Sequence, residues 1–160
     1  MDALLASGRY EALLATHEQA WLLAAGRRFL PHASGRLAVA GAEAFERVQS
    51  KVSFALLCDE LDIPQPAWHE VGCEADLDRV GYPVWVKAAY STAGRGVRRA
   101  ATRAEAVSAW RALGGTGTAG DPVKVMVQAP AAGAYRQVAA LFDRGQLIAA
   151  ACSQRIGLGA

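Results

Sequence analysis

The chain has 160 residues, of which 52% are hydrophobic and 20% are charged, a balance typical of a folded protein with a core. The formal net charge of +2 is too small to indicate a nucleic acid or an anionic membrane as partner. No apolar run reaches the length of a membrane helix and no signal peptide opens the chain, so we expect a cytoplasmic protein. Three scattered cysteines, Cys58, Cys73 and Cys152, lack the spacing of a zinc site and are interpreted as buried thiols.

The first part of the chain combines helical and strand patterns. Glu11–Ala15 fits a short strand or the start of a helix, and Glu18–Arg28 is apolar at helical spacing with basic residues in its last turn. Gly35–Ala40 is typical of a strand. The apolar positions of Ala42–Leu61 keep a helical period with a break near Gln49-Ser50, which predicts one or two helices. Two prolines follow and must end this segment, because proline lacks an amide donor.

The second part alternates strands with helices. Thr102 is expected to cap a helix over Arg103–Leu113, with Glu105 completing a capping box, and Glu74–Val80 predicts an acidic-started helix. Asp143-Arg144-Gly145 is a hairpin signal between the last two strands. A loop is expected over 114–121, and the predicted strands are 68–71, 84–88, 96–100, 123–128, 135–143 and 146–152.

One stretch places a lysine beside a loop of small residues. Lys87 ends the apolar run that begins at Val84, and the loop from Ser91 closes with Gly94-Arg95-Gly96. Exposed backbone amides together with a point charge favour a polyphosphate ligand. The GxxxxGK[ST] pattern is absent, and GxGxxG requires a helix where this sequence predicts a strand. Taken alone, the segment is equally compatible with a mobile hairpin that carries an exposed lysine.

The order of motifs around this loop resembles that of the ATP-grasp family, specifically the group similar to carbamoyl phosphate synthetase large chains and biotin carboxylase. The likeness runs from Lys51, which begins a helix, through the strand lysine and the small-residue loop to the end of the chain. It implies an α/β (α+β) fold. The implied parts are a partial Rossmann-like pre-ATP-grasp domain over 1–50, the N-terminal ATP-grasp subdomain over 51–127, and the start of the C-terminal subdomain over 128–160.

The resemblance implies an ATP site. Lys51 matches the first basic residue that contacts the nucleotide, and Lys87 matches the strand lysine that reaches the α and β phosphates. The family's flap over the triphosphate is usually a Gly-Gly-Gly run, and its adenine-binding segment usually carries a glutamate where this chain has Ala129. The flap positions are Ser91, Thr92, Ala93, Gly94 and Gly96, with a Ser-Thr-Ala run that predicts a stiffer flap, and the adenine segment is Gln128, Ala129, Pro130 and Ala131.

The implied activity is that of a ligase: ATP phosphorylates a small-molecule carboxylate, and an amine or similar nucleophile attacks the acyl phosphate. Mg²⁺ is expected in the complete protein, but the family's acidic and asparagine ligands find no match here, so we expect a truncated, inactive front half with no assigned metal ligand or catalytic residue. The alternative is a non-catalytic nucleotide-binding or subunit-interaction module. A dinucleotide or sugar-nucleotide binder resting on residues 1–50 lacks a glycine fingerprint. The acceptor and the oligomeric state are left open.

Overall fold

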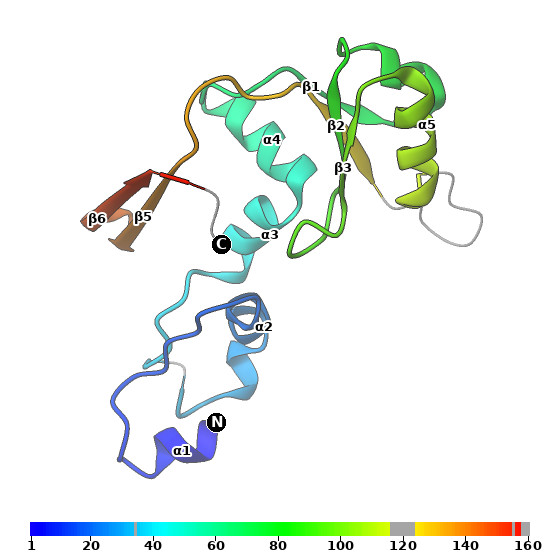
Figure 1. Ribbon diagram of the computed structural model, residues 1–160. Helices are drawn as coiled ribbons and strands as arrows, with labels where there is room; N and C mark the ends of the chain where they lie inside the picture. The colour runs from blue at the N-terminus through cyan, green and yellow to red at the C-terminus, as the bar shows by residue number, and fades with distance from the viewer. Residues whose placement is uncertain (34, 116–123, 155, 158–160) are drawn as a thin grey trace. The chain divides into compact units, whose positions relative to one another are not determined.

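The computed structural model describes residues 1–33, 35–115, 124–154 and 156–157 (Figure 1). The chain forms two compact units, Met1–Ala129 and Pro130–Ala160, and each is described by itself. Within the described ranges, no helix combines the length and the apolar character needed to cross a membrane.

A four-stranded antiparallel sheet lies at the centre of the first unit. Its strands are β1 (Trp68–Val71), β2 (Val84–Ala88), β3 (Val97–Ala100) and β4 (Val125–Gln128), in the spatial order β1-β4-β2-β3. All four were predicted: the bounds of β1 and β2 match, and the predicted starts of β3 and β4 lie one and two residues early. Strand β2 is therefore an interior strand, and its residues point alternately to the two faces of the sheet.

Two helices cover the opposite faces of this sheet (Figure 1). Helix α5 (Arg103–Ala112) buries Ala106 and Trp110 against one face, together with the alternate valines of β2 and β4. Helix α4 (Lys51–Glu60) packs against the other face, where Met126 of β4 is buried. Lys87 belongs to this second face, because its neighbours in β2, which are buried, point to the first.

The sequence signal for α5 is confirmed with one difference. Thr102 Oγ1 accepts the Glu105 backbone N–H at 3.3 Å, as predicted. The Glu105 carboxylate accepts from the N–H of Ala101 at 2.7 Å, one residue before the cap, rather than from the cap itself. The first contact satisfies an amide that a helix N-terminus otherwise leaves without a partner, and the second attaches the residue before the cap to the first turn of the helix.

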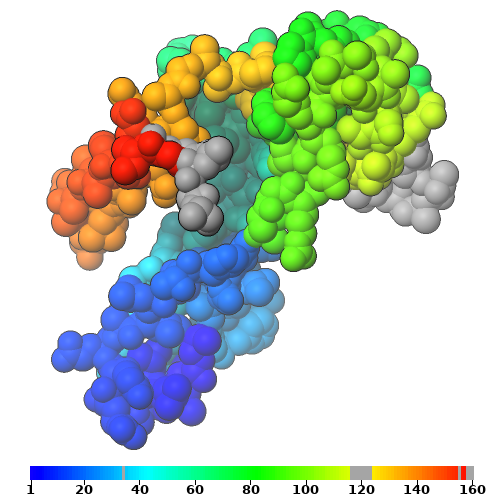
Figure 2. Space-filling view, viewed as in Figure 1, coloured from blue at the N-terminus to red at the C-terminus, as the bar shows by residue number. Residues whose placement is uncertain are grey.

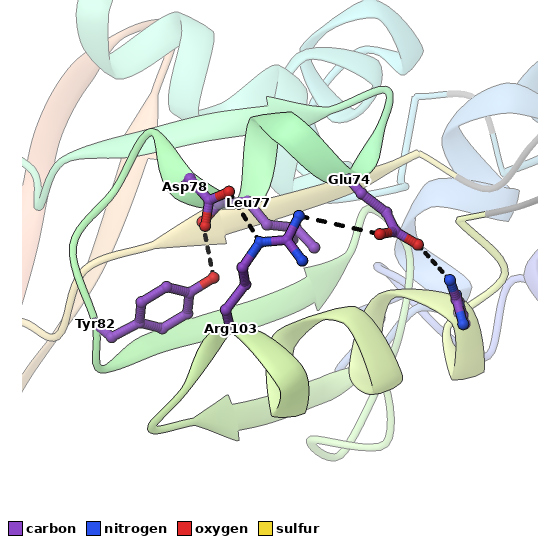
Figure 3. Close-up of polar contacts among 6 residues, drawn as sticks. Glu74, Leu77, Asp78, Tyr82 and Arg103 are labelled. Carbon is purple, nitrogen blue, oxygen red and sulfur yellow. Dashed lines mark hydrogen bonds and ion pairs between the residues drawn. The ribbon is translucent and has the colours of Figure 1, made fainter.

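Charged side chains connect α5 to a short 3-10 helix, η2 (Glu74–Asp78), at the surface (Figure 3). Arg103 Nε lies 3.0 Å from Asp78 Oδ2, and its Nη2 lies 4.0 Å from Glu74 Oε2. Arg111 also pairs with Glu74. The hydrogen bond and charge of Asp78 raise the pKa of Arg103. Because these side chains are largely exposed, solvent screens the charges and each pair contributes little to the stability of the fold.

Residues 1–50 contain only short helices in their described part. These are α1 (Asp2–Ala6), α2 (Gln19–Ala25), the 3-10 helix η1 (Arg27–Phe29) and α3 (Ala42–Gln49). The break predicted near Gln49-Ser50 is confirmed, since Ser50 is extended between α3 and α4. Its hydroxyl accepts the backbone N–H of Ser53 at 3.3 Å and so caps α4.

The strand predicted over Gly35–Ala40 is wrong. This segment makes a single parallel bridge, between Leu37 and Leu13. The guanidinium of Arg27 donates to the carbonyl oxygens of Leu37 and Val39, at 3.4 and 3.1 Å. A side chain thus takes the acceptors that a neighbouring strand would use, and no ladder is needed.

The second unit is a β-hairpin of β5 (Arg136–Asp143) and β6 (Gln146–Gln154). Arg144 and Gly145, the two turn residues, have φ angles of 47° and 83°, as a tight primed turn requires, so the hairpin signal is confirmed. Cys152 on β6 is exposed, as is Cys73 in the first unit, so the prediction of buried thiols holds only for Cys58. The domain limits drawn at residues 50 and 127 stay predictions.

Candidate functional site

A cavity of about 370 Å³ lies beside α4 in the first unit, on the sheet face that carries Lys87. Its walls come from the helix, from the segment after the helix and from β2 and β4. The lining residues are Lys51, Phe54, Ala55, Cys58, Ile63, Pro64, Gln65, Pro66, Lys87, Met126 and Gln128. Among these described residues there are two cations and no carboxylate, so the cavity favours an anion.

Lys51 is the first residue of α4 and is fixed through both its backbone and its side chain. Its N–H donates to the carbonyl oxygen of Ala89 at 2.9 Å, which attaches the helix start to the end of β2. Its Nζ donates to Ser91 Oγ at 2.8 Å and lies 3.5 Å from the Ser91 carbonyl oxygen. Lys51 is thereby fixed between the helix and the loop that follows β2.

Lys87 reaches the same cavity from an interior strand. Its Nζ donates to Gln128 Oε1 at 2.6 Å across the β2–β4 pair. Since an ammonium group only donates, this contact directs the amide oxygen of Gln128 toward Lys87. A neutral amide satisfies one donor of Lys87 but leaves its positive charge without a counter-charge.

The two lysines influence each other. Burial lowers the pKa of Lys51. Burial lowers the pKa of Lys87 as well, and the nearby charge of Lys51 lowers it further. Each effect penalises the charged form, and a bound anion would remove the penalty.

The loop between β2 and β3 projects from the surface (Figure 2). Its Ser91 contacts Lys51, which lines this cavity. Ala93 and Gly94 have φ angles of 51° and 72°, so the turn uses the left-handed region at a glycine and at an alanine. Gly96 is buried and close to Ser91: a Cβ there would lie 2.4 Å from Ser91 Cβ. The loop is thus closed tightly at its base.

The structure brings together only some of the predicted loop residues. Ser91 contacts Lys51, whereas Thr92 Oγ1 donates to Glu18 Oε1 at 2.6 Å and faces a different cavity. Ala93 and Gly94 are exposed and do not line the 370 Å³ cavity. Their predicted contact with a triphosphate therefore stays a prediction.

The predicted adenine segment is divided between the two units. Gln128 lines the cavity. The N–H of Ala129 donates to the carbonyl oxygen of Ala67 at 2.8 Å, so this amide already has a partner. Pro130 and Ala131 are exposed residues of the second unit.

Several cavity residues were missed by the sequence reasoning. Ala55 and Cys58 were not assigned to the site, although they share one face of α4 at helical spacing with Lys51, which was predicted. Gln65 had been interpreted only as part of a helix stop. Its side-chain amide donates to Ala55 O and Asp59 Oδ1, at 2.7 and 2.6 Å, and ties this segment to α4.

Comparison with solved structures identifies the fold. D-alanyl-alanine synthetase A from Vibrio cholerae is similar with a TM-score of 0.65 and 20% identity, over 86% of this chain and 42% of that chain. A carboxyaminoimidazole ribonucleotide synthase from Aspergillus clavatus, complexed with ATP, is similar with a TM-score of 0.61 and 16% identity, over 78% of this chain and 33% of that chain. A RimK domain ATP-grasp protein from Sphaerobacter thermophilus is similar with a TM-score of 0.54 and 26% identity, over 84% of this chain and 52% of that chain.

The chain has the ATP-grasp fold, as the order of motifs predicted. It spans about half or less of the length of these structures. No protein-family model matches the sequence, and no curated protein matches it. The narrower resemblance to carbamoyl phosphate synthetase and biotin carboxylase stays a prediction.

Proposed function

We propose that this chain is the ATP-binding part of an ATP-grasp ligase that activates a small-molecule carboxylate for attack by an amine or similar nucleophile. The observation that carries the proposal is the pair Lys51 and Lys87, which line one cavity from separate elements. The chain has only three lysines, and two of them meet there.

The chemistry of the cavity fits a nucleotide polyphosphate. Two ammonium groups with lowered pKa values repel each other, and a chain of phosphates bridges such a pair with charge-assisted hydrogen bonds. Apolar side chains complete the walls and suit the face of a base; they are Phe54, Ile63, Pro64 and Met126. The Gln128 amide group lies at the same wall.

The roles follow from these positions. Lys51 and Lys87 bind and neutralise phosphate oxygens, and the loop from Ser91 to Gly96 excludes water above them. Recognition of adenine through the N–H of Ala129 is not proposed, because that group already donates to Ala67. When bound, ATP supplies the phosphoryl group that activates the carboxylate.

Within the described residues, no three His, Cys, Asp or Glu side chains lie close enough together to hold a metal ion. No residue of this chain is therefore assigned as a Mg²⁺ ligand, and no step is derived through the metal. We also propose that the protein is cytoplasmic.

Calorimetric titration of ATP with Mg²⁺ tests the proposal. Lys87→Ala is expected to weaken binding by about tenfold or more, the loss of one charge-assisted hydrogen bond. Lys124→Ala is the matched control, since Lys124 is exposed and lies 3.4 Å from Glu70, outside the cavity. Equal affinities of the wild type and Lys87→Ala would remove the role given to Lys87.

A further inference from the structure

A second cavity, of about 400 Å³, lies in the first unit at the base of the β2–β3 loop. It is built by the start of α2, the end of α3 and the first loop residues. The side chains that give it its character are Glu18, Trp21, Leu22, Gln49 and Tyr90. None of them was assigned a function from the sequence.

The lining of this cavity is complementary to a cation with an apolar body. Glu18 is its one charged lining residue among those described, and a carboxylate in the wall favours a cationic group as its partner. Trp21 and Tyr90 add two aromatic rings, whose faces attract ammonium groups. Leu22 adds apolar surface for the remainder of a ligand.

Glu18 retains the capacity to bind such a group. Its Oε1 accepts the hydroxyl of Thr92 at 2.6 Å, and its Oε2 contacts His17. A carboxylate offers about four acceptor positions, so both oxygens can accept further donors. The Glu18 side chain is 45% exposed, which leaves it accessible from the cavity.

The second cavity adjoins the first through Ser91. Ser91 is part of the wall of the second cavity, and its hydroxyl accepts from Lys51, which lines the first. A ligand in the second cavity therefore lies one side chain away from an ammonium group assigned to phosphate binding.

We propose that this second cavity binds a small molecule that carries a protonated amine next to an apolar group, with Glu18 as the counter-charge. The assignment of this cavity to the second substrate of a ligase rests on the proposed function above. The binding of the amine does not rest on it, because it needs no nucleotide.

The test compares two probes that share one carbon skeleton, 3-methylbutylamine and 3-methylbutan-1-ol, in NMR titrations of the ¹⁵N-labelled chain. The indole N–H signal of Trp21, assigned as the one lost in Trp21→Phe, reports occupancy of the cavity. The amine is expected to shift this signal in a saturable manner, and the alcohol to bind about tenfold more weakly or not at all.

Two variants locate the effect. Glu18→Gln is expected to weaken amine binding about tenfold, whereas Glu11→Gln, an exposed carboxylate of the same segment, leaves it unchanged. Equal binding of the two probes, an unchanged affinity in Glu18→Gln, or no saturable shift at Trp21 would overturn the proposal. If Glu18→Gln fails to fold, the comparison of the two probes on the wild type decides.

ATP titrations of the same samples separate the two proposals. A chain that binds the amine but not ATP would contradict the proposed function and leave this inference standing. A chain that binds ATP but does not distinguish the amine from the alcohol would contradict this inference and leave the proposed function standing.

Discussion

The charge of Lys51 lowers the pKa of Lys87, although one residue starts a helix and the other lies in an interior strand. Both side chains are half-buried in the wall of one cavity, and none of its described lining residues carries a negative charge. Two like charges held together in this way destabilise the protein until an anion binds.

The first prediction concerns the reactivity of the two lysines. Burial disfavours the ammonium form, so each lysine loses its proton at a lower pH than its ordinary pKa of 10.5 would give. The rate of acetylation of Lys51 and Lys87, followed by mass spectrometry, should rise at a lower pH in the folded chain than in the urea-unfolded chain. Coincident or reversed pH profiles would show that the environment does not favour the neutral amines.

A second prediction is that Lys87→Met loses ATP binding without losing stability. The pKa of Lys87 is lower in the folded chain than in the unfolded chain, because burial and the charge of Lys51 disfavour its ammonium form. The free-energy cost of holding this charge in the folded chain is therefore fully present at neutral pH. It fades as the pH rises from that lowered value toward 10.5, where the unfolded chain also loses the proton. Solvent screening of a half-buried group keeps the gain in the variant to about 1 kcal/mol or less.

Urea denaturation at pH 7 and at pH 9.5 measures this difference. The free energy of unfolding of Lys87→Met should equal or exceed that of the wild type at neutral pH, and the gap should narrow in alkali. A variant that is clearly less stable at pH 7 would mean that the Lys87–Gln128 hydrogen bond outweighs the cost of burying the charge.

The third prediction concerns the base of the loop. A Cβ on Gly96 would lie 2.4 Å from Ser91 Cβ and 2.6 Å from Ser91 Oγ, so Gly96→Ala must displace Ser91 and its bond to Lys51. We expect a loss of about 1 to 3 kcal/mol in stability, together with weaker ATP binding. Gly81→Ala is the control, because a Cβ there meets nothing within 4 Å. Thermal melts and calorimetry that show equal effects for the two alanines would contradict the close packing.

A fourth prediction concerns Ala93, which has a φ of 51°. A β-branched side chain is strongly disfavoured in this region, so Ala93→Val should cost about 1 to 3 kcal/mol. Ala93→Gly should change stability by less than about 1 kcal/mol, since relief of strain is offset by greater freedom of the unfolded chain. Chemical denaturation of both variants measures the difference, and similar stabilities would place Ala93 outside the left-handed region.

Local signals in the sequence predicted much of the first unit. The β2 strand follows from an apolar run with strong strand formers, and the break between α3 and α4 follows from Ser50, whose hydroxyl caps the second helix. In the second unit, the β5–β6 hairpin follows from its turn residues. The strand prediction for residues 35–40 was wrong because Arg27 donates to carbonyl groups of this segment. Such a long-range side-chain contact has no local signature in the sequence.

The candidate site was predictable as a pair of lysines but not as a cavity. Lys51 and Lys87 were singled out together from the resemblance to a family. Their partners, Ser91 and Gln128, are brought close by the pairing of β2 with β4 and by the turn of the loop, neither of which periodicity reveals. The cavity of Glu18 likewise needs three segments that only the folded chain brings together.

Protection of lysines by nucleotides tests the central claim most directly, because the chain has only three lysines and one of them lies outside the cavity. Each lysine is acetylated briefly at a fixed pH, with and without ATP and Mg²⁺, and quantified by mass spectrometry. We predict that ATP protects Lys51 and Lys87 together, that adenosine protects them far less, and that Lys124 is unaffected. Failure of ATP to protect both cavity lysines, or equal protection of Lys124, would contradict the account.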